Sequence, residues 1–415
     1  MNRTGKTLLF VLIFLLFWVT LTPFMDLRDP SVLLAQEQGN ALQQLVSLSL
    51  FFISALYLVA NWQIALKMLS PLLIILLFWQ FITVFTSDYS GISFRRYVYS
   101  ITVIVTAMAW VILPENQQHF QRMLKYLSLF ILGLSYFGVI FMPEVSIHNE
   151  AEVLELINAG SWRGHFSHKN IAGPAMIVLI IYNLYLLRRD DYLIPALNIV
   201  LATIFLIFSN NKTSIGLIVI ALLVAETIRF VRLLPLQYLA AIIPVGLMLL
   251  LTVGTVVSLP VQDFVTGLIS DPTFTGRTEI WKFALEQLRA HPWVGFGFDT
   301  FWNMSHLING GYEIETWASR AGHAHNGYIN LMMTTGLIGI TLFIVWMLFC
   351  PLLDYHRSQK SGNDAALAVM YLRIWVFMML YASLESPFFA PRGQVWFSLL
   401  AAVFALRLHA RVKAR

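Results

Sequence analysis

The sequence has little charge and almost no cysteine. Only 12% of its 415 residues are charged and 58% are hydrophobic, with a mean hydropathy of +0.72. These values exclude an ordinary soluble globular protein. The single cysteine, Cys350, lies in an apolar run, so an intramolecular disulfide is excluded. The net charge of +5 is spread over short segments rather than gathered in one patch, which argues against nucleic-acid binding.

Long hydrophobic runs are what the sequence has in abundance. They recur at roughly 17–20 residues, the length that crosses a bilayer as a helix. Because a backbone in lipid must satisfy its own hydrogen bonds, they predict an all-α polytopic integral membrane protein with about 12 transmembrane helices. The expected spans are Leu8–Phe24, Leu42–Ala60, Pro71–Phe85, Tyr97–Leu113, Tyr126–Met142, Ile171–Leu187, Leu193–Phe208, Ser214–Thr227, Tyr238–Val257, Tyr328–Cys350, Ala365–Ser383 and Val395–Leu406.

One polar segment, residues 258–326, interrupts this pattern within a single membrane domain of residues 1–415. The first apolar run lacks a small-residue cleavage site and is therefore expected to remain as an anchor. The distribution of Lys and Arg then predicts that both termini are cytoplasmic and that 258–326 forms a long extracytoplasmic loop. Within this loop, residues 278–290 have the spacing of an amphipathic helix, which Pro292 ends.

Ionisable residues are scarce within the expected spans. Arg373, two turns into the eleventh span, is the notable one, and its pairing and role are open. Carboxylates are expected to be absent at membrane depth. A transporter or flippase for lipid-linked sugars, the alternative to an enzyme, needs a charged central cavity, so this scarcity argues against it.

Four polar stretches are expected to meet the outer membrane surface. They are residues 161–170, 209–214, 275–281 and 320–339. They combine cations, amides and imidazoles, a composition that suits a phosphorylated lipid. Arg277 and Lys212 are the best candidates to bind a diphosphate. His325, where the loop meets an apolar helix, is the candidate base that activates a sugar hydroxyl.

Other interpretations of these residues remain open. Each cation could simply set topology, and His325 could be a helix-start residue bonded to backbone. A zinc-dependent hydrolase is the third alternative, with Glu313 or Glu315 as its base. The four histidines that could bind the zinc are His165, His168, His323 and His325.

In order and spacing these motifs resemble the O-antigen ligase and O-antigen or exopolysaccharide polymerase family of bacterial membrane glycan transferases. His325-Asn326, nine residues, Gly336, two residues and Gly339 match the family's ligase pattern. The Gly-Arg-x-x-x-Trp of residues 276–281 and the Lys-Thr-Ser of residues 212–214 are similar to further family motifs. Gly164-His-Phe-Ser-His-Lys-Asn170 looks like a segment of exopolysaccharide-polymerase-like members.

The resemblance implies an inverting transfer, independent of metal and cofactor, from undecaprenyl diphosphate to a glycan or lipid A-core acceptor. It places the enzyme in the inner membrane with its site on the periplasmic side. It implies His325 as the base and Arg277 with Lys212 as diphosphate ligands. Ligases commonly have Arg at the position of Lys212, which weakens assignment to the ligase branch. Residues expected to line the substrate site are Arg163, His165, His168, Asn170, His323, Asn326 and Arg320.

Overall fold

The computed structural model describes residues 1–29, 41–152, 158–187, 192–269, 271–302, 318, 321–360, 364–390 and 393–412. These residues are helical and contain no β-strand beyond an isolated bridge between Ile147 and Trp162. The all-α prediction is therefore confirmed for them.

Each of the expected apolar runs contains a helix. The helices of the N-terminal half are α1 (Arg3–Trp18), α3 (Ala41–Ala60), α4 (Trp62–Met68), α5 (Pro71–Phe85), α6 (Ser90–Ile112), α7 (Gln117–Phe141) and the short η1 (Pro143–Val145). The later ones are α8 (Lys169–Leu186), α9 (Leu193–Phe208), α10 (Lys212–Phe230), α11 (Leu234–Leu251), α12 (Gly254–Val257), α13 (Leu259–Leu268), α14 (Arg277–Leu288), α16 (Gly327–Ile344), η4 (Val345–Phe349), α17 (Cys350–Ser358), α18 (Ala365–Tyr381) and α19 (Gln394–Arg411).

By length and apolar composition, six helices of the described chain can cross a membrane, and seven if the bent pair α4 and α5 is one span. These data fit a polytopic membrane protein, whereas the expected count of about 12 spans is not confirmed. The α4–α5 pair bends by 80°. Several helices, such as α9 with 16 residues, are shorter than a full span.

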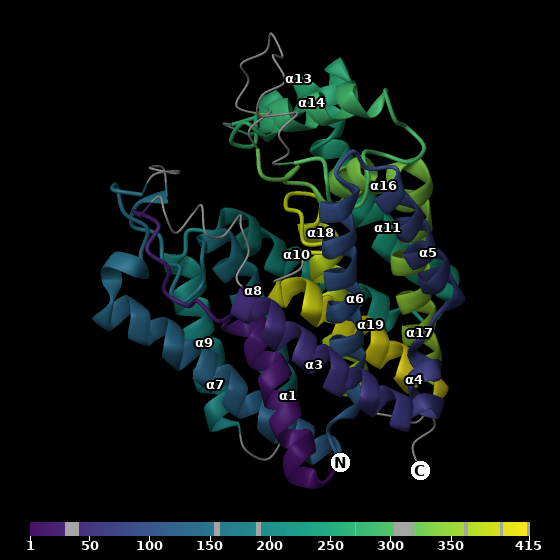
Figure 1. The fold of residues 1–415 in the computed structure, drawn as a ribbon. Coiled ribbons are helices and arrows are strands. Elements are labelled where there is room, and N and C mark those ends of the chain that lie inside the picture. The colour runs from purple at the N-terminus through teal and green to yellow at the C-terminus, as the bar shows by residue number, and fades with distance from the viewer. Residues whose placement is uncertain are drawn as a thin grey trace.

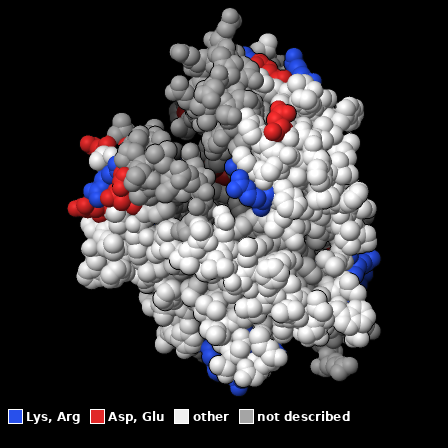
Figure 2. Space-filling view, in the orientation of Figure 1, with Lys and Arg blue, Asp and Glu red and all other residues white. Residues whose placement is uncertain are grey.

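The bundle is built around helices that are buried on every side. The helices α8, α18 and α19 bury residues all around their axes, as expected for the centre of a membrane domain. Peripheral helices such as α11 bury few residues, here only Gln237 and Ala241. Figure 1 shows both termini at one end of the bundle, and α13 and α14 above the opposite end. Charged side chains are sparse across the middle of the face in Figure 2.

Polar side chains define where several of these helices begin. His168, Asn211 and Asn326 accept hydrogen bonds from the backbone N–H groups that open α8, α10 and α16. Such caps satisfy donors that have no partner within the helix. All three lie in stretches that the sequence identifies as candidate sites, so these stretches are helix starts as well.

The expectation that the spans contain no carboxylate is wrong at one position, close to the end of a span. Glu226 lies in α10, within the predicted span Ser214–Thr227, and its carboxylate forms ion pairs with Arg373 of α18 and with Arg229. The pairing lowers the cost of placing each charge among helices. Arg373 therefore pairs with a neighbouring helix of the bundle.

Helix α16 has a break at Gly336, where the loop before it comes into backbone contact. Gly336 has φ 68° and ψ −174°, a conformation that only glycine adopts readily. A Cβ at this position would lie 2.1 Å from the carbonyl oxygen of Trp293. The loop is fixed there by hydrogen bonds from Phe296 N–H to the Met333 carbonyl and from Leu337 N–H to the Pro292 carbonyl, both 2.8 Å. Gly336 is the glycine that the ligase pattern places after His325-Asn326 and nine intervening residues. It lets the polar loop pack directly against the helix that follows His325.

The Gly336→Ala substitution should destabilise the protein by at least about 2 kcal/mol, because it adds both a strained backbone and a backbone clash. Thermal unfolding of the detergent-solubilised protein measures this. The matched control is Gly216→Ala on α10, where a Cβ meets nothing within 4 Å and the change should be neutral or mildly stabilising. Equal melting temperatures for the two variants would contradict the assigned role of Gly336.

Candidate active site

The centre of the site is a carboxylate shared by an arginine and a histidine. Oε1 of Glu385 lies 2.6 Å from Nη2 of Arg277, and Oε2 lies 3.1 Å from Nδ1 of His325. Glu385 is only 5% exposed. The contact joins the long polar segment, the start of α16 and the turn after α18, so two predicted catalytic residues are brought together by a third residue.

Glu385 was not among the residues that sequence analysis singled out. The signal for it is that it is the last acidic residue of the chain and follows directly after an apolar run. That isolation could have marked it, because an unpaired carboxylate at the edge of a membrane helix needs a cation. What sequence could not supply is the identity of the cation, which lies more than 100 residues away.

Arg277 and His325 hold this carboxylate in its ionised form. Burial alone raises the pKa of Glu385, but the charge of Arg277 and the hydrogen bond from His325 outweigh it and lower the pKa to about 2. An ionised carboxylate can only accept, so Nδ1 of His325 must be the protonated nitrogen of the ring. In neutral His325 the Nε2 lone pair is therefore the one that can take a proton, as a general base requires.

The backbone of His325 has an uncommon conformation, and a hydrogen bond to His323 stabilises it. Its φ is 46°, in the left-handed region, where non-glycine residues are uncommon. Its N–H donates to Nδ1 of His323 at 3.2 Å, and the two ring centroids are 4.1 Å apart. Burial first, then the charges of His325 and Arg277, lower the pKa of His323 to about 4. His323 is therefore neutral near pH 7 and can serve as this acceptor.

Helix α14 explains the Gly-Arg-x-x-x-Trp motif. Gly276 before it has φ 81°, and Arg277 and Trp281 lie four residues apart on one face. Arg277 reaches Glu385, while the buried Trp281 donates from Nε1 to the Ala324 carbonyl at 2.9 Å. Ala324 lies between the two histidines, so Trp281 positions their backbone. The prediction of a helix in residues 278–290 is confirmed by α14.

Asn326 connects the start of α16 to the turn that carries Glu385. Its Oδ1 accepts from the N–H groups of Tyr328 and Ile329, and its Nδ2 donates to the Ser383 carbonyl at 2.9 Å. Its backbone N–H donates to the Ser386 hydroxyl at 3.2 Å. The side chain is fully buried. The amide is thus engaged in holding His325 beside Glu385, and a direct contact of Asn326 with substrate remains only a prediction.

The stretches before α8 and α10 meet beside this centre. Nδ2 of Asn211 donates to Oδ1 of Asn170 at 2.9 Å, and the Tyr381 hydroxyl donates to the Asn170 carbonyl at 2.9 Å. Tyr381 ends α18, four residues before Glu385. Lys212 is the exposed first residue of α10. Hydrogen bonds from Thr273 and Thr275 lower the pKa of Asp271, and the charge of Lys212 adds to this, which places Lys212 near the turn before Arg277.

The remaining predicted residues differ in how close they come to the centre. His168 caps α8 and is near enough to contribute to the lowered pKa of His323. Arg163 and His165 are both buried. Nη2 of Arg163 donates a hydrogen bond to the Met25 carbonyl at 2.9 Å, and Nε2 of His165 is hydrogen-bonded to the Trp18 carbonyl at 2.8 Å. These contacts tie the segment before α8 to the end of α1 and the residues after it, and a role of Arg163 or His165 in substrate binding stays a prediction. Arg320, Glu313 and Glu315 lie outside the described residues.

A metal site at this centre uses a different set of residues from the predicted zinc ligands. Among the described residues, ligand atoms of His323, His325 and Glu385 lie within 4.8 Å of one another. However, both Glu385 oxygens are engaged, one of them with a guanidinium that would repel a cation. His165 and His168 are not part of this group. The arrangement therefore favours a network of proton donors and acceptors over a metal centre.

Comparison with known proteins shows which family the middle of the chain is similar to. The family model described as O-antigen ligase matches residues 197–344. This range contains Lys212, Arg277 and His325 and excludes Glu385. The resemblance seen in the sequence motifs, to the O-antigen ligase family of membrane glycan transferases, is thereby confirmed.

Three curated relatives agree with this class. The chain is 31% identical over 117 residues to the exopolysaccharide production protein ExoQ of Rhizobium meliloti, covering 26% of each chain. It is 29% identical over 143 residues to an O-antigen ligase of Pseudomonas aeruginosa, covering 33% of this chain and 32% of that protein. It is 26% identical over 117 residues to a putative polysaccharide ligase of Rickettsia felis, covering 27% and 28%. The chain thus matches about a quarter to a third of the length of these relatives.

The lowered pKa of His323 predicts acid sensitivity of the site. Between pH 6.5 and about 4 the unfolded chain binds a proton at His323 that the folded protein does not, so stability falls as the pH falls through this window. The loss should be on the order of 2 kcal/mol at pH 4 relative to pH 7. Denaturation of the wild type and of His323→Gln at both pH values measures it. The variant should lose less stability than the wild type, and identical losses would contradict the assignment.

Proposed function

We propose that this protein is a membrane glycosyltransferase of the O-antigen ligase or exopolysaccharide polymerase type. It transfers a glycan from undecaprenyl diphosphate to a sugar hydroxyl of an acceptor, with inversion and without a metal. The observation that carries the proposal is the Glu385 carboxylate shared by Arg277 and His325. It supplies an oriented imidazole next to fixed positive charge, which a hydroxyl attack on a diphosphate-linked sugar requires.

The reaction assigns one step to each group. The acceptor hydroxyl oxygen attacks the anomeric carbon from the face opposite to the diphosphate. Its proton goes to Nε2 of His325 while the bond from the anomeric carbon to the diphosphate oxygen breaks. The imidazolium that forms is stabilised by Glu385, which lies 3.1 Å from Nδ1. The diphosphate leaves with the bonding electrons and needs no general acid of its own.

Positive charge for the diphosphate comes from side chains and from helix starts. Lys212 opens α10 and Arg277 opens α14, and α8 and α16 begin in neighbouring stretches. Helix N-termini carry partial positive charge and free N–H groups that favour phosphate. Among the described residues, Arg277 donates from Nη2 to Glu385, so the other N–H groups of its guanidinium remain for a ligand. Lys212 binds as a point charge rather than a two-pronged fork, which leaves ligase and polymerase both open.

The site is proposed to face the periplasm, from a bacterial inner membrane with both termini in the cytoplasm. The support is that both termini lie at one end of the bundle while α14 and the start of α16 lie at the other (Figure 1). A lipid-linked glycan displayed on the outer leaflet reaches this end without crossing the membrane. The acceptor is a glycan for a polymerase and a lipid A-core or protein sugar for a ligase.

The first test is transfer in vitro with undecaprenyl-diphosphate-linked oligosaccharide and EDTA. The wild type should turn over, and His325→Ala should be slower by about 100-fold or more, because a positioned general base contributes that much. The matched control is His291→Ala, an exposed histidine of the same polar segment, which should keep wild-type turnover. A ladder of products on a gel indicates a polymerase, and one shifted band indicates a ligase.

Each contrary result of this assay points to a different error. Equal turnover by wild type and His325→Ala would remove His325 as the base. Loss of wild-type turnover in EDTA, restored by added zinc, would favour a metal enzyme at His323, His325 and Glu385. Absence of turnover by folded wild type with several such donors would contradict the transferase itself.

The Glu385→Gln variant distinguishes a role of the carboxylate in orienting His325 from a role in donor binding. It keeps the shape of the side chain but removes the charge that orients His325, so kcat should fall by roughly 10–100-fold. The KM for the donor should not rise, because Arg277 loses its competitor for phosphate. Steady-state kinetics with the same donor measure both. An unchanged kcat with a raised KM would show that Glu385 serves donor binding alone.

A further inference from the structure

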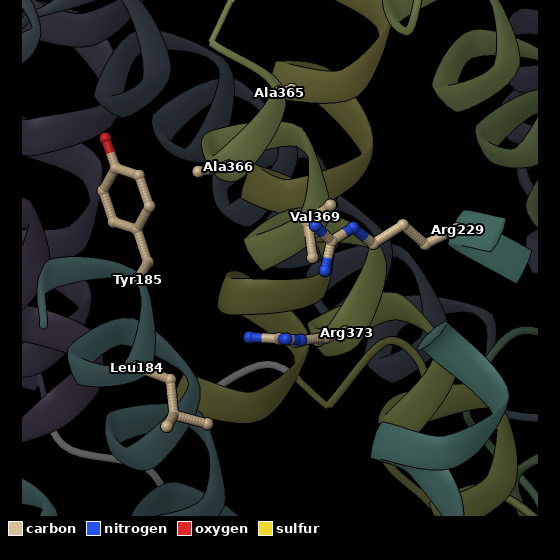
Figure 3. Close-up of a pocket in the computed structure, with 7 residues that line it drawn as sticks. All are labelled: Leu184, Tyr185, Arg229, Ala365, Ala366, Val369 and Arg373. Atoms are coloured by element: carbon tan, nitrogen blue, oxygen red, sulfur yellow. The ribbon is translucent and has the colours of Figure 1, made fainter. Parts of the chain in front are cut away.

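A polar cavity lies at the end of the bundle opposite to the candidate active site. It has a volume of about 240 Å³ and is bounded by the ends of α8 and α10 and the start of α18. Its polar side chains are Arg229 and Arg373, and its apolar wall includes Leu184, Val369 and the ring of Tyr185. Figure 3 shows both guanidinium groups directed toward the space between α8 and α18. At about 30 Å³ per water, the space holds roughly eight waters, more than a phosphate group needs.

The two guanidinium groups of the cavity outnumber the carboxylate that they share. Glu226 accepts from Nη1 of Arg229 at 2.8 Å and also pairs with Nη2 of Arg373. Two guanidinium groups therefore share one carboxylate, which leaves one net positive charge on these three residues. The Asp364 carboxylate at the start of α18 accepts instead from the Tyr185 hydroxyl at 3.1 Å. Nε of Arg373 is buried and has no hydrogen-bond partner in the described part of the chain. A buried N–H of a charged group without an acceptor is costly and indicates that something occupies the space beside it.

The helices that bound the cavity fix its depth in the membrane. Lys212 starts α10 beside the candidate active site, and Arg229 lies 17 residues further along the same helix. At 1.5 Å per residue the two are about 25 Å apart along the axis, close to the thickness of the hydrocarbon core. The cavity thus lies at the surface of the other leaflet, near the two termini, and not in the candidate active site.

We propose that this cavity binds the phosphate of an anionic phospholipid from the leaflet opposite to the active site. The planar, multiply donating guanidinium groups suit a phosphate, and the unpartnered Nε of Arg373 supplies one further donor. The apolar wall suits the glycerol and the first methylenes of acyl chains. Basic pockets between transmembrane helices at the cytoplasmic surface are typical lipid headgroup sites.

The competing interpretation is an ion triad that only holds α10 against α18. The two interpretations predict different effects of the Glu226→Gln change on lipid binding. If the triad is purely structural, Glu226→Gln leaves two unpaired cations and no gain in lipid binding. If the cavity binds phosphate, the same change raises the net charge from one to two and strengthens lipid binding.

The test uses the full chain, delipidated in a neutral detergent, with lipid binding measured by native mass spectrometry and by the lipid-induced change in melting temperature. The probes are phosphatidylglycerol, phosphatidylethanolamine of the same acyl chains, and inorganic phosphate. Phosphatidylglycerol should bind the wild type, and Arg229→Gln and Arg373→Gln should each weaken it about tenfold, the effect of one charge-assisted hydrogen bond. Glu226→Gln should strengthen it. The matched control Arg122→Gln, an exposed cation of α7 at the same end, should not change it.

The outcomes decide between the interpretations. Wild-type phosphatidylglycerol binding by Arg229→Gln, or no strengthening in Glu226→Gln, overturns the proposal. If Arg373→Gln does not fold, these two variants decide alone, because both side chains are partly exposed. Inorganic phosphate that reproduces the whole melting-temperature shift and prevents lipid binding would show a soluble anion as the occupant and overturn the lipid assignment. Equal binding of phosphatidylethanolamine would overturn the assignment to an anionic phospholipid.

Discussion

The structure of the site depends on one carboxylate that is held ionised just after the end of α18. Glu385 stays charged because Arg277 and His325 compensate its burial, and it fixes the position of both in return. Three segments far apart in the chain meet at this residue: the start of α14, the start of α16 and the turn after α18. Without the carboxylate, the guanidinium and the imidazole would have no common partner to hold them close together.

The surrounding backbone serves this contact. Asn326 ties the start of α16 to Ser383 and Ser386, and Trp281 holds the carbonyl between the two histidines. Because Gly336 has no side chain, the preceding loop packs directly against α16, and this contact fixes the polar segment to the helix that follows His325. Each of these is a helix start or a helix break, where backbone groups lack partners within the helix and can be used for positioning.

Much of this could be predicted from the sequence, because the signals are local. The length of the apolar runs predicts the helices, and the spacing of apolar residues in 278–290 predicts α14. The order of the motifs indicates the family resemblance. The contacts between distant segments could not be predicted. Glu385 appears in the sequence as a lone acid after a span, and Glu226 was overlooked although it lies inside an expected span. The sequence also could not show that Arg163 and Asn326, predicted to line the substrate site, are buried and donate hydrogen bonds to backbone carbonyls.

The central claim is that Glu385 and His325 act as one unit in the transfer, and a double-mutant cycle on turnover tests it most directly. The variants are Glu385→Gln, His325→Gln and the two together, compared with the wild type at saturating donor. If the residues form one unit, the double variant should be about as slow as the slower single variant, because the second change removes nothing further. If the double variant is slowed by the product of the two single effects, the residues act independently and the account of the site is wrong.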